Sequence, residues 1–289
     1  MNESLLINKV AIPGNARVHI KKGRGGRIKT AAKCKSTTVV RITLIVLVAL
    51  TLYGMLTFNY GNIDFMREVS RTIANMRVMF GEAALSHLSF GAAMYQLFVT
   101  FSIGVLATIL SAVLAFFIAV FCAKNIMSPN VANIMKGIVA AIRAIPQILW
   151  VLVFVIAAGL GGTAAVTALT LSSTSFLVKV YAESIEEMDE GSIEALRACG
   201  AGFWTIVFQT VFPSTARYLL AWTFVRFEVN FVSAIAVGAA AGIGGIGFDL
   251  FMAGSLYFDL RELGFLTIVI VIAVILVEMM AIRIKAILR

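Results

Sequence analysis

Apolar residues fill several long stretches of this chain without interruption by a charged side chain. Four stretches contain no Asp, Glu, Lys, Arg or His: Leu88–Ala123, Ala144–Val178, Val229–Phe248 and Leu263–Val277. A helix that crosses the hydrocarbon core of a bilayer needs roughly 20 consecutive apolar residues. A soluble helix would carry polar residues along its outer face. The pattern therefore predicts an all-α, polytopic membrane protein.

The apolar pattern predicts about six transmembrane helices. Their expected ranges are 42–60, 91–123, 137–158, 163–183, 216–240 and 263–284. Pro146 is expected to kink the third helix. Segment 61–88 carries charges that cancel, which is typical of an outer loop.

Basic residues are concentrated before the first predicted helix. The net charge is +9, and Glu3 is the only acidic residue among residues 1–41. By the positive-inside rule this end is cytoplasmic, and an even number of helices returns the basic C-terminus to the same side. Contact with anionic lipid and a solvated, disordered tail both stay open for this segment. We therefore expect a basic tail (1–41), a first helix with its outer loop (42–90) and a transport domain (91–289).

Segment 184–213, between the fourth and fifth predicted helices, is the longest charged stretch after the tail. Ser192 is predicted to cap a short helix that ends at Gly200 and Gly202. A second amphipathic piece follows, with apolar residues at helical spacing: Phe203, Trp204, Val207, Phe208 and Val211. Pro213 suits the first turn of the next helix. Such a helix pair either docks a partner protein or lies flat on lipid.

This segment resembles the "EAA" loop of ATP-binding-cassette (ABC) importer permeases of type I. The family pattern is Glu-Ala-Ala, three residues, Gly, nine residues, Ile-x-Leu-Pro. This chain matches it at Glu194, Ala195, Gly200 and Pro213, and departs from it at Leu196, Thr210 and Phe212.

The resemblance implies a MetI-like transmembrane domain that inserts a coupling helix into a cleft of an ATPase subunit. The residues that would carry coupling are Glu194, Ala195, Leu196, Gly200 and Pro213. The implied partners are two ATP-binding subunits, a second permease copy and an extracytoplasmic substrate-binding protein, all at a bacterial cytoplasmic membrane. No P-loop sequence occurs in the chain, so the ATPase is expected to be a separate polypeptide and this subunit no enzyme. Neither a cofactor, a metal nor a nucleic acid is implied.

Three further segments look like the phosphonate (PhnE-type) branch of these permeases: Glu194–Ala201, Val225–Asn230 and Ala241–Gly247. The resemblance implies phosphonate, or a related oxyanion such as phosphite or phosphate, as cargo. An amino acid or another small solute stays open, because the binding protein usually selects the ligand. An ATP-independent secondary transporter is the alternative of another class. It predicts inverted repeats and a mid-membrane carboxylate, for which Glu228 is the one candidate.

Arg226 falls near the middle of the fifth predicted helix, where a charge is costly and points to function. Asn230 shares its helix face, whereas Glu228 points elsewhere. Arg226 and Asn230 either line the translocation pathway and meet an oxyanion, or form a structural pair with a carboxylate of a neighbouring helix.

The last candidates lie at glycines and at helix ends. Gly242, Gly244, Gly245 and Gly247 lack the preceding strand of a dinucleotide site, so they are expected to form a flexible break and part of an outer gate. Ser172–Ser175 are expected to help helices pack. Lys179 and Arg143 are expected to snorkel to the interface. His87 is interpreted as a surface residue.

Overall fold

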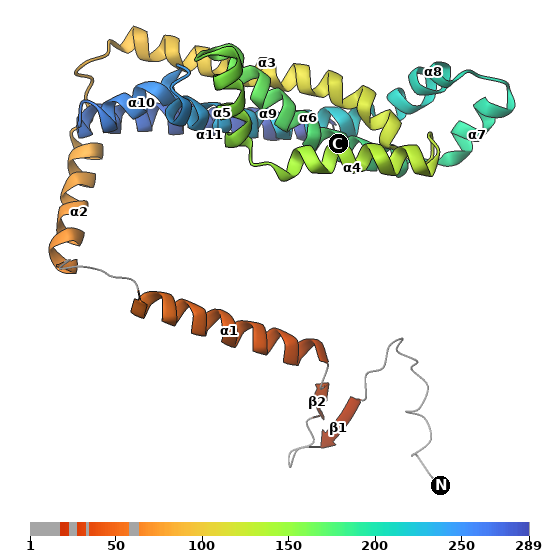
Figure 1. The fold of residues 1–289 in the computed structure, drawn as a ribbon, viewed down its shortest axis with the longest axis horizontal. Helices are drawn as coiled ribbons and strands as arrows, with labels where there is room; N and C mark the ends of the chain where they lie inside the picture. Colours follow the sequence, from red (N-terminus) through yellow and green to blue (C-terminus); the bar gives the residue numbers. More distant parts are fainter. Residues whose placement is uncertain (1–17, 23–27, 33–34, 58–63, 289) are drawn as a thin grey trace. The chain divides into compact units, whose positions relative to one another are not determined.

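The computed structural model describes residues 18–22, 28–32, 35–57 and 64–288. These residues form two compact units, one ending at Glu68 and the other beginning at Val69. In the first unit, strands β1 (Val18–Lys22) and β2 (Ile28–Ala32) form an antiparallel hairpin. Helix α1 (Lys35–Thr57) follows it (Figure 1).

The hairpin corrects part of the sequence interpretation. A disordered tail was one of the two interpretations left open, but all five residues of β1 pair with residues of β2, with Val18 opposite Ala32. Helix α1 begins at Lys35, so residues 35–41 of the predicted tail belong to the first helix, which was expected to begin at residue 42. Residues 1–17, 23–27 and 33–34 of the tail, and the predicted end of this helix, lie outside the described residues. Apart from this hairpin, every element in the described ranges is helical, which confirms the all-α prediction.

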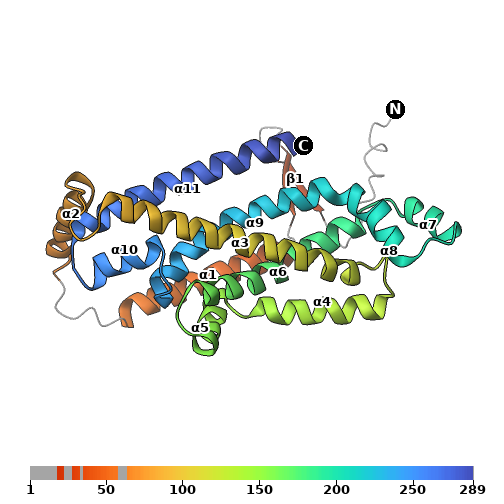
Figure 2. The ribbon, with the colours of Figure 1, turned by 90° about the horizontal axis from the view of Figure 1, so that it is seen from above.

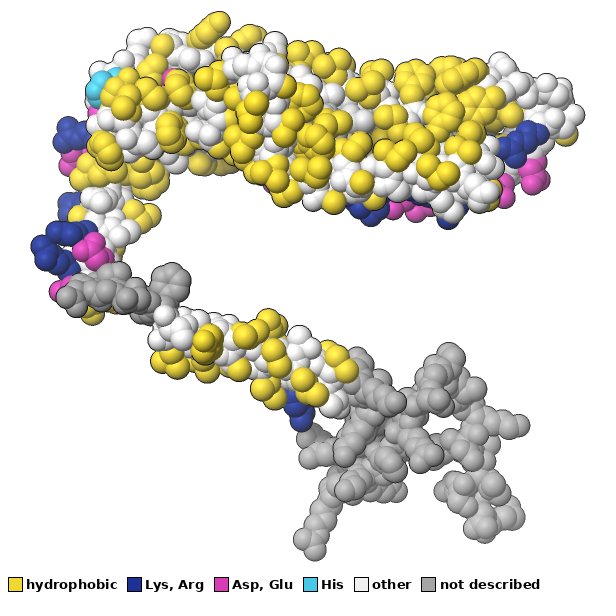
Figure 3. All heavy atoms as spheres, viewed as in Figure 1, with side chains coloured by type: hydrophobic (Ala, Val, Ile, Leu, Met, Phe, Trp, Pro, Cys, Tyr) yellow, Lys and Arg dark blue, Asp and Glu magenta, His cyan; other side chains and the backbone are white. Residues whose placement is uncertain are grey.

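The second unit is a bundle of long helices. Its main members are α3 (Phe90–Cys122), α6 (Gly162–Glu186), α9 (Phe212–Ala241) and α11 (Leu260–Leu288). They run side by side in Figures 1 and 2, and α9 packs against the other three. Within the described residues, five helices are long and apolar enough to cross a membrane, and one bent pair would make a sixth. Hydrophobic side chains cover most of the visible surface of this bundle (Figure 3), as lipid-facing helices require.

Small residues let the helices of this bundle approach closely. Ala107, Ala115 and Ala119 of α3 are fully buried. A Cβ added at Gly104 would lie 3.2 Å from the Cα of Phe231 on α9, so the two backbones nearly touch there. Lipid provides little hydrophobic force between helices, and close backbone packing of this kind replaces it.

The third predicted helix is broken rather than kinked. It consists of α4 (Pro129–Ala144) and α5 (Gln147–Ala158), which meet at an angle of 83°. Ile145 and Pro146 have extended backbone conformations. Proline lacks an N–H group, and its ring pushes the preceding residue out of the helical region, so the chain turns sharply at this point.

The fifth predicted helix begins earlier than the sequence suggested. Helix α8 (Phe203–Ile206), the π-helical turn η1 (Val207–Val211) and α9 form one helical run from Phe203 to Ala241. Pro213 therefore does not separate two helices. The wider π turn directly before it accommodates a residue without an N–H group in a continuous helix.

Two predicted loops contain helices. Helix α2 (Phe65–Gly81) occupies most of the expected outer loop. The charge content did not distinguish the two, because a helix with one polar face carries as many charges as a loop. Helix α10 (Ile246–Ser255) lies between α9 and α11 and packs against both. Gly247 of α10 faces the carbonyl group of Ile235 on α9, and a Cβ at this position would overlap it.

We expect Gly247→Ala to destabilise the protein, because the added methyl group must push α10 away from α9. The expected cost is about 1–3 kcal/mol, measured as a lower unfolding temperature of the purified protein in detergent. Gly137→Ala is the matched control, since a Cβ at this α4 position meets no atom within 4 Å. It should stabilise the helix by about 0.5–1 kcal/mol. Equal unfolding temperatures for the two variants would contradict the close packing of α10.

Candidate functional site

The predicted coupling segment folds into a short helix with a glycine joint. Helix α7 (Glu190–Ala198) follows Asp189, which takes the N-cap position. The predicted cap at Ser192 is wrong by one turn, because α7 already begins at Glu190; the Asp189 side chain makes no capping hydrogen bond. Gly200 has φ +77°, and the Ala201 N–H donates to the Leu196 carbonyl. This left-handed glycine ends the helix, as the sequence indicated.

Helix α7 has an outward face and a docked face. Glu194 and Ala195 are exposed, whereas Ile193 is buried against the bundle and Leu196 packs beside it. Arg197 donates to the carbonyl oxygens of Asn125 and Ile126 at 3.2 Å each. The helix is therefore tied to the turn between α3 and α4 while its Glu-Ala face stays free for a partner.

The aromatic residues after the glycine joint pack mainly against α3. Phe203 stacks on Phe121 at 6.0 Å between ring centroids, and Trp204 meets Phe117 at 6.2 Å. Trp204 remains 46% exposed. This aromatic cluster fixes the start of the long helical run to the C-terminal end of α3, and it leaves an apolar edge at the surface.

A chain of buried hydrogen bonds links three transmembrane helices. Arg226 Nε of α9 donates to Ser173 Oγ of α6 at 2.9 Å, and Ser173 Oγ donates to Asn230 Oδ1 at 2.6 Å. Asn230 Nδ2 then donates to Thr108 Oγ1 of α3 at 2.9 Å. Arg226 is 8% exposed and Asn230 is fully buried. The guanidinium carbon of Arg226 also lies 5.3 Å from the centre of the Phe176 ring, a favourable cation–π geometry.

This network brings together residues that the sequence had treated separately. Arg226 and Asn230 share a buried face of α9, as predicted, and half-buried Glu228 lies off that face. Within the described residues, Arg226 pairs with a hydroxyl group and an aromatic ring rather than with a carboxylate. Ser173, from the predicted packing patch, is the central member. Thr108 was missed, and its only signal was a polar side chain inside a long apolar run.

The glycine-rich segment after α9 forms a tight turn. Gly242, Gly244 and Gly245 have positive φ values of 63°, 90° and 79°, a conformation that residues with a Cβ avoid. The turn directs the chain into α10, where the Ile246 N–H donates to Thr100 Oγ1 at 3.0 Å. Gly247 then contacts α9 as described above. The flexible break expected from sequence is thus a turn held by packing, and its role in a gate stays a prediction.

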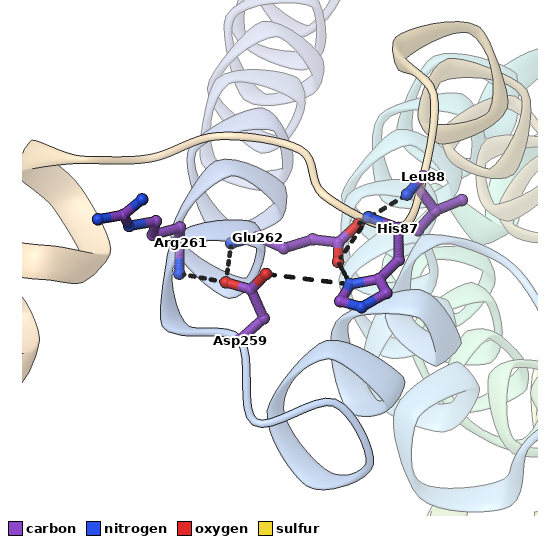
Figure 4. Close-up of polar contacts among 5 residues, drawn as sticks. All are labelled: His87, Leu88, Asp259, Arg261 and Glu262. Carbon is purple, nitrogen blue, oxygen red and sulfur yellow. Dashed lines mark hydrogen bonds and ion pairs between the residues drawn. The ribbon is translucent and has the colours of Figure 1, made fainter.

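His87 takes part in a polar clasp at the other end of the bundle (Figure 4). Glu262 of α11 is fully buried and accepts hydrogen bonds from His87 Nδ1 at 2.7 Å and from the Leu88 N–H at 2.9 Å. Asp259 accepts from the N–H groups of Arg261 and Glu262 and so caps α11. Ligand atoms of His87, Asp259 and Glu262 lie within 4.8 Å of one another. Both oxygens of Glu262 are already engaged, so these residues act as a clasp between α11 and the segment before α3.

Two carboxyl groups near this clasp have shifted pKa values. Burial raises the pKa of Asp249 on α10 to about 6, and the charge of Glu262 adds to the effect. Asp249 is 9% exposed, and its Oδ2 has no hydrogen-bond partner among the described residues. The pKa of Asp259 is lowered, first by the Ser86 hydroxyl and then by the Glu262 N–H.

Comparison with known proteins gives this geometry a context. The family described as "Binding-protein-dependent transport system inner membrane component" matches residues 115–289. The phosphate-import permease protein PhnE of Mycolicibacterium smegmatis is 35% identical over 182 residues, which cover 62% of this chain and 34% of that protein. The phosphite transport system permease protein PtxC of Stutzerimonas stutzeri is 31% identical over 180 residues, 62% of this chain and 65% of that protein. The chain thus matches about a third to two thirds of the length of these relatives.

Solved structures resemble the fold. The inward-facing MetNI methionine ABC transporter superposes with a TM-score of 0.62 at 21% identity, covering 71% of this chain and 100% of that chain. An amino acid ABC transporter with histidines has a TM-score of 0.53 at 17% identity, covering 78% of this chain and 99% of that chain. These likenesses concern the fold alone.

We expect Ser173→Ala to destabilise the bundle by about 1–3 kcal/mol, because Arg226 Nε and Asn230 Oδ1 would both lose a buried partner. Thermal unfolding of the purified protein measures the loss. Ser102→Ala is the matched control, since Ser102 donates to the Phe98 carbonyl of its own helix and to no other group in the described part of the chain. A Ser173→Ala variant as stable as Ser102→Ala would contradict a stabilising role for the network.

We expect the folded protein to lose stability as pH rises through about 6, because Asp249 has a raised pKa in the folded state. The contribution is fully present below the ordinary Asp pKa and disappears as the buried carboxyl ionises. Asp249→Asn should remove this dependence. Its advantage in unfolding temperature over the unsubstituted protein should grow between about pH 4 and pH 6 and stay constant above that, corresponding to about 1–3 kcal/mol. Parallel pH profiles for the two proteins would contradict the assignment.

Proposed function

Because the chain belongs to the family of binding-protein-dependent transport system inner membrane components, we propose that it is the transmembrane permease subunit of an ATP-driven importer. The observation that carries this proposal is helix α7, which is exposed on its Glu-Ala face and docked on the other. A short, oriented helix with a free face suits the cleft of a cytosolic ATPase. The proposed assembly has two ATPase subunits, a second permease copy and an extracytoplasmic binding protein.

The route from α7 into the membrane supports a coupling role. Gly200 forms a joint between α7 and α8, and α8 continues through the π turn and Pro213 into α9 without a break. A displacement of α7 by the ATPases would reach α9 through this joint and through the aromatic contacts with α3. We propose Glu194 and Ala195 as the docking residues, Leu196 as the residue that holds α7 against the bundle, and Gly200 and Pro213 as the positions that shape the transmission.

The buried network gives α9 a connection to the rest of the bundle. Arg226 and Asn230 bind Ser173 of α6, and Asn230 binds Thr108 of α3. A movement of α9 therefore either carries α3 and α6 with it or exchanges these hydrogen bonds. We propose that the network sets which helices move as one body when the transporter alternates between outward-open and inward-open states. Contact of Arg226, Glu228 or Asn230 with cargo, and a gate at Gly242–Gly247, stay predictions.

We propose a phosphate-like oxyanion, such as phosphonate, phosphite or phosphate, as cargo. The support is the similarity to permeases whose names specify phosphate and phosphite transport. The basic N-terminal segment, the α7 loop and the C-terminus would lie on the cytoplasmic side. In this arrangement residues 1–41 are the tail, 42–90 the first helix with its outer segment, and 91–289 the transport domain with its coupling segment 184–213.

The proposal is tested by co-expressing the chain with an ATPase and a binding protein encoded beside it. Glu194→Lys reverses a charge on the free face of α7, and Gly200→Pro removes the left-handed joint. Each should lower the ATPase stimulation caused by ligand-loaded binding protein roughly tenfold, while the variant still inserts into the membrane. Glu187→Lys, an exposed charge reversal before α7, is the control and should retain stimulation.

The outcomes separate the parts of the proposal. Failure of any ATPase to co-purify with the unsubstituted chain would contradict the assignment as an importer subunit. Co-purification with stimulation by another solute, and none by phosphonate, phosphite or phosphate, would contradict the cargo alone. Full stimulation in both α7 variants would contradict the coupling role.

A further inference from the structure

A hollow of about 220 Å³ lies between the second half of α4 and the C-terminal part of α6. Lys136 and Arg143 of α4, and Lys179 and Glu183 of α6, line it. The apolar part of its lining comes from Cys122, Val139, Ala140, Val178 and Ala182. In Figure 3, basic and acidic side chains interrupt the hydrophobic surface along the edge of the bundle that α4 occupies. The residues that line this hollow belong neither to the coupling segment 184–213 nor to the Arg226 network.

The positive charges of the hollow are incompletely neutralised. Lys136 donates to both oxygens of Glu186, at 2.8 and 2.9 Å. Lys179 lies 3.6 Å from Glu183, and both side chains are about half exposed, so their attraction is weak. Arg143 has no hydrogen bond or ion pair with any other residue that the structure describes. Three cations thus face two carboxylates, and the excess charge is that of Arg143.

The unneutralised charge is set apart from the neutralised pair along the bundle, and its side chain is exposed. Arg143 comes two helical turns after Lys136 in α4, and Lys179 comes two turns before Glu186 in α6. Since an α-helix rises about 1.5 Å per residue, both lie about 10 Å from the Lys136–Glu186 pair along the helices. They lie on the side toward the membrane interior, because Glu186 ends α6 next to the α7 segment. Both cationic side chains are exposed, and the only carboxylate beside Lys179 in the described part of the chain is half exposed, so an anion can reach them from outside the protein.

We propose that this hollow is a binding site for a phosphate-type oxyanion, held by Arg143 and Lys179. A guanidinium group binds phosphate oxygens with two parallel N–H donors, and the donors of Arg143 are unused. The anion would lie between the two like charges and reduce their mutual repulsion. Glu183 at the same hollow limits the affinity, which permits release.

Two sources could supply this chemistry. One is the cargo as it leaves the pathway toward the cytoplasm, and this source rests on the proposed function. The other is the phosphate headgroup of an anionic lipid in the inner leaflet, which does not rest on it. Snorkelling of Arg143 and Lys179 to the interface, as expected from sequence, would require neither source.

The test uses the full chain in nanodiscs, without an ATPase. Binding of radiolabelled inorganic phosphate is measured at low ionic strength in phosphatidylcholine discs, and retention of phosphatidylglycerol is measured by native mass spectrometry from mixed discs. Arg143→Gln and Lys179→Gln should each weaken the binding of whichever probe occupies the hollow about tenfold, because each variant loses one charge-assisted hydrogen bond. Arg143→Lys should keep part of it. Arg217→Gln removes an exposed arginine of α9 outside the hollow and should change nothing.

The results distinguish the sources and the proposals. If the unsubstituted chain binds phosphate saturably and Arg143→Gln does not, the site takes a free anion. If Arg143→Gln instead loses only the retained phosphatidylglycerol, the site takes a lipid headgroup. If neither probe distinguishes Arg143→Gln from the unsubstituted chain, the inference is overturned. Because Arg143 has no partner to lose among the described residues, its substitution should leave the unfolding temperature unchanged. Failure of an ATPase to co-purify would overturn the proposed function and leave this binding result standing.

Discussion

Arg226 is a cation inside a bundle whose helices are built largely from charge-free apolar runs, and the hydrocarbon around such a bundle offers no water to solvate it. Its hydrogen bond to Ser173 and its position over Phe176 draw α6 against α9. Asn230 extends the same chain of bonds to Thr108 on α3. The need to satisfy these polar groups inside the protein thus fixes the mutual register of three helices. Gly104 permits it, because a larger residue would hold α3 away from Phe231.

Breaks in the backbone determine how the ends of this core are connected. Pro146 turns α5 by 83° away from α4, and the glycine turn at 242–245 sends α10 back against α9. Pro213, by contrast, lies within a continuous helical run because the π turn at Val207–Val211 accommodates it. The segment with the Glu-Ala face therefore has one flexible joint, at Gly200, before a helix that reaches the polar core. A rigid path with a single joint is the geometry that a coupling element needs.

Charged side chains outside the core lie at the two ends of the bundle and serve different purposes. At one end, Glu262 accepts hydrogen bonds from His87 and from the Leu88 N–H. Burial raises the pKa of Asp249 nearby. At the other end, Lys136 and Glu186 neutralise each other, whereas Arg143 does not find a partner among the described residues. The carboxylate of Glu262 is satisfied within the protein, whereas the guanidinium group of Arg143 has unused donors within the described part of the chain.

The sequence by itself determined the membrane-spanning, all-α class, the approximate helix ranges and the family resemblance in the α7 segment, because long apolar runs and the spacing of Glu194, Gly200 and Pro213 are properties of the linear chain. It also indicated that Arg226 and Asn230 share a face. It did not reveal that Ser173 and Thr108 are their partners, that α8 is continuous with α9, or that His87 meets Glu262. The tertiary structure decided these points, since a hydroxyl, a proline or a histidine has several acceptable environments. Only the neighbours brought together by folding, far apart along the chain, select one of them.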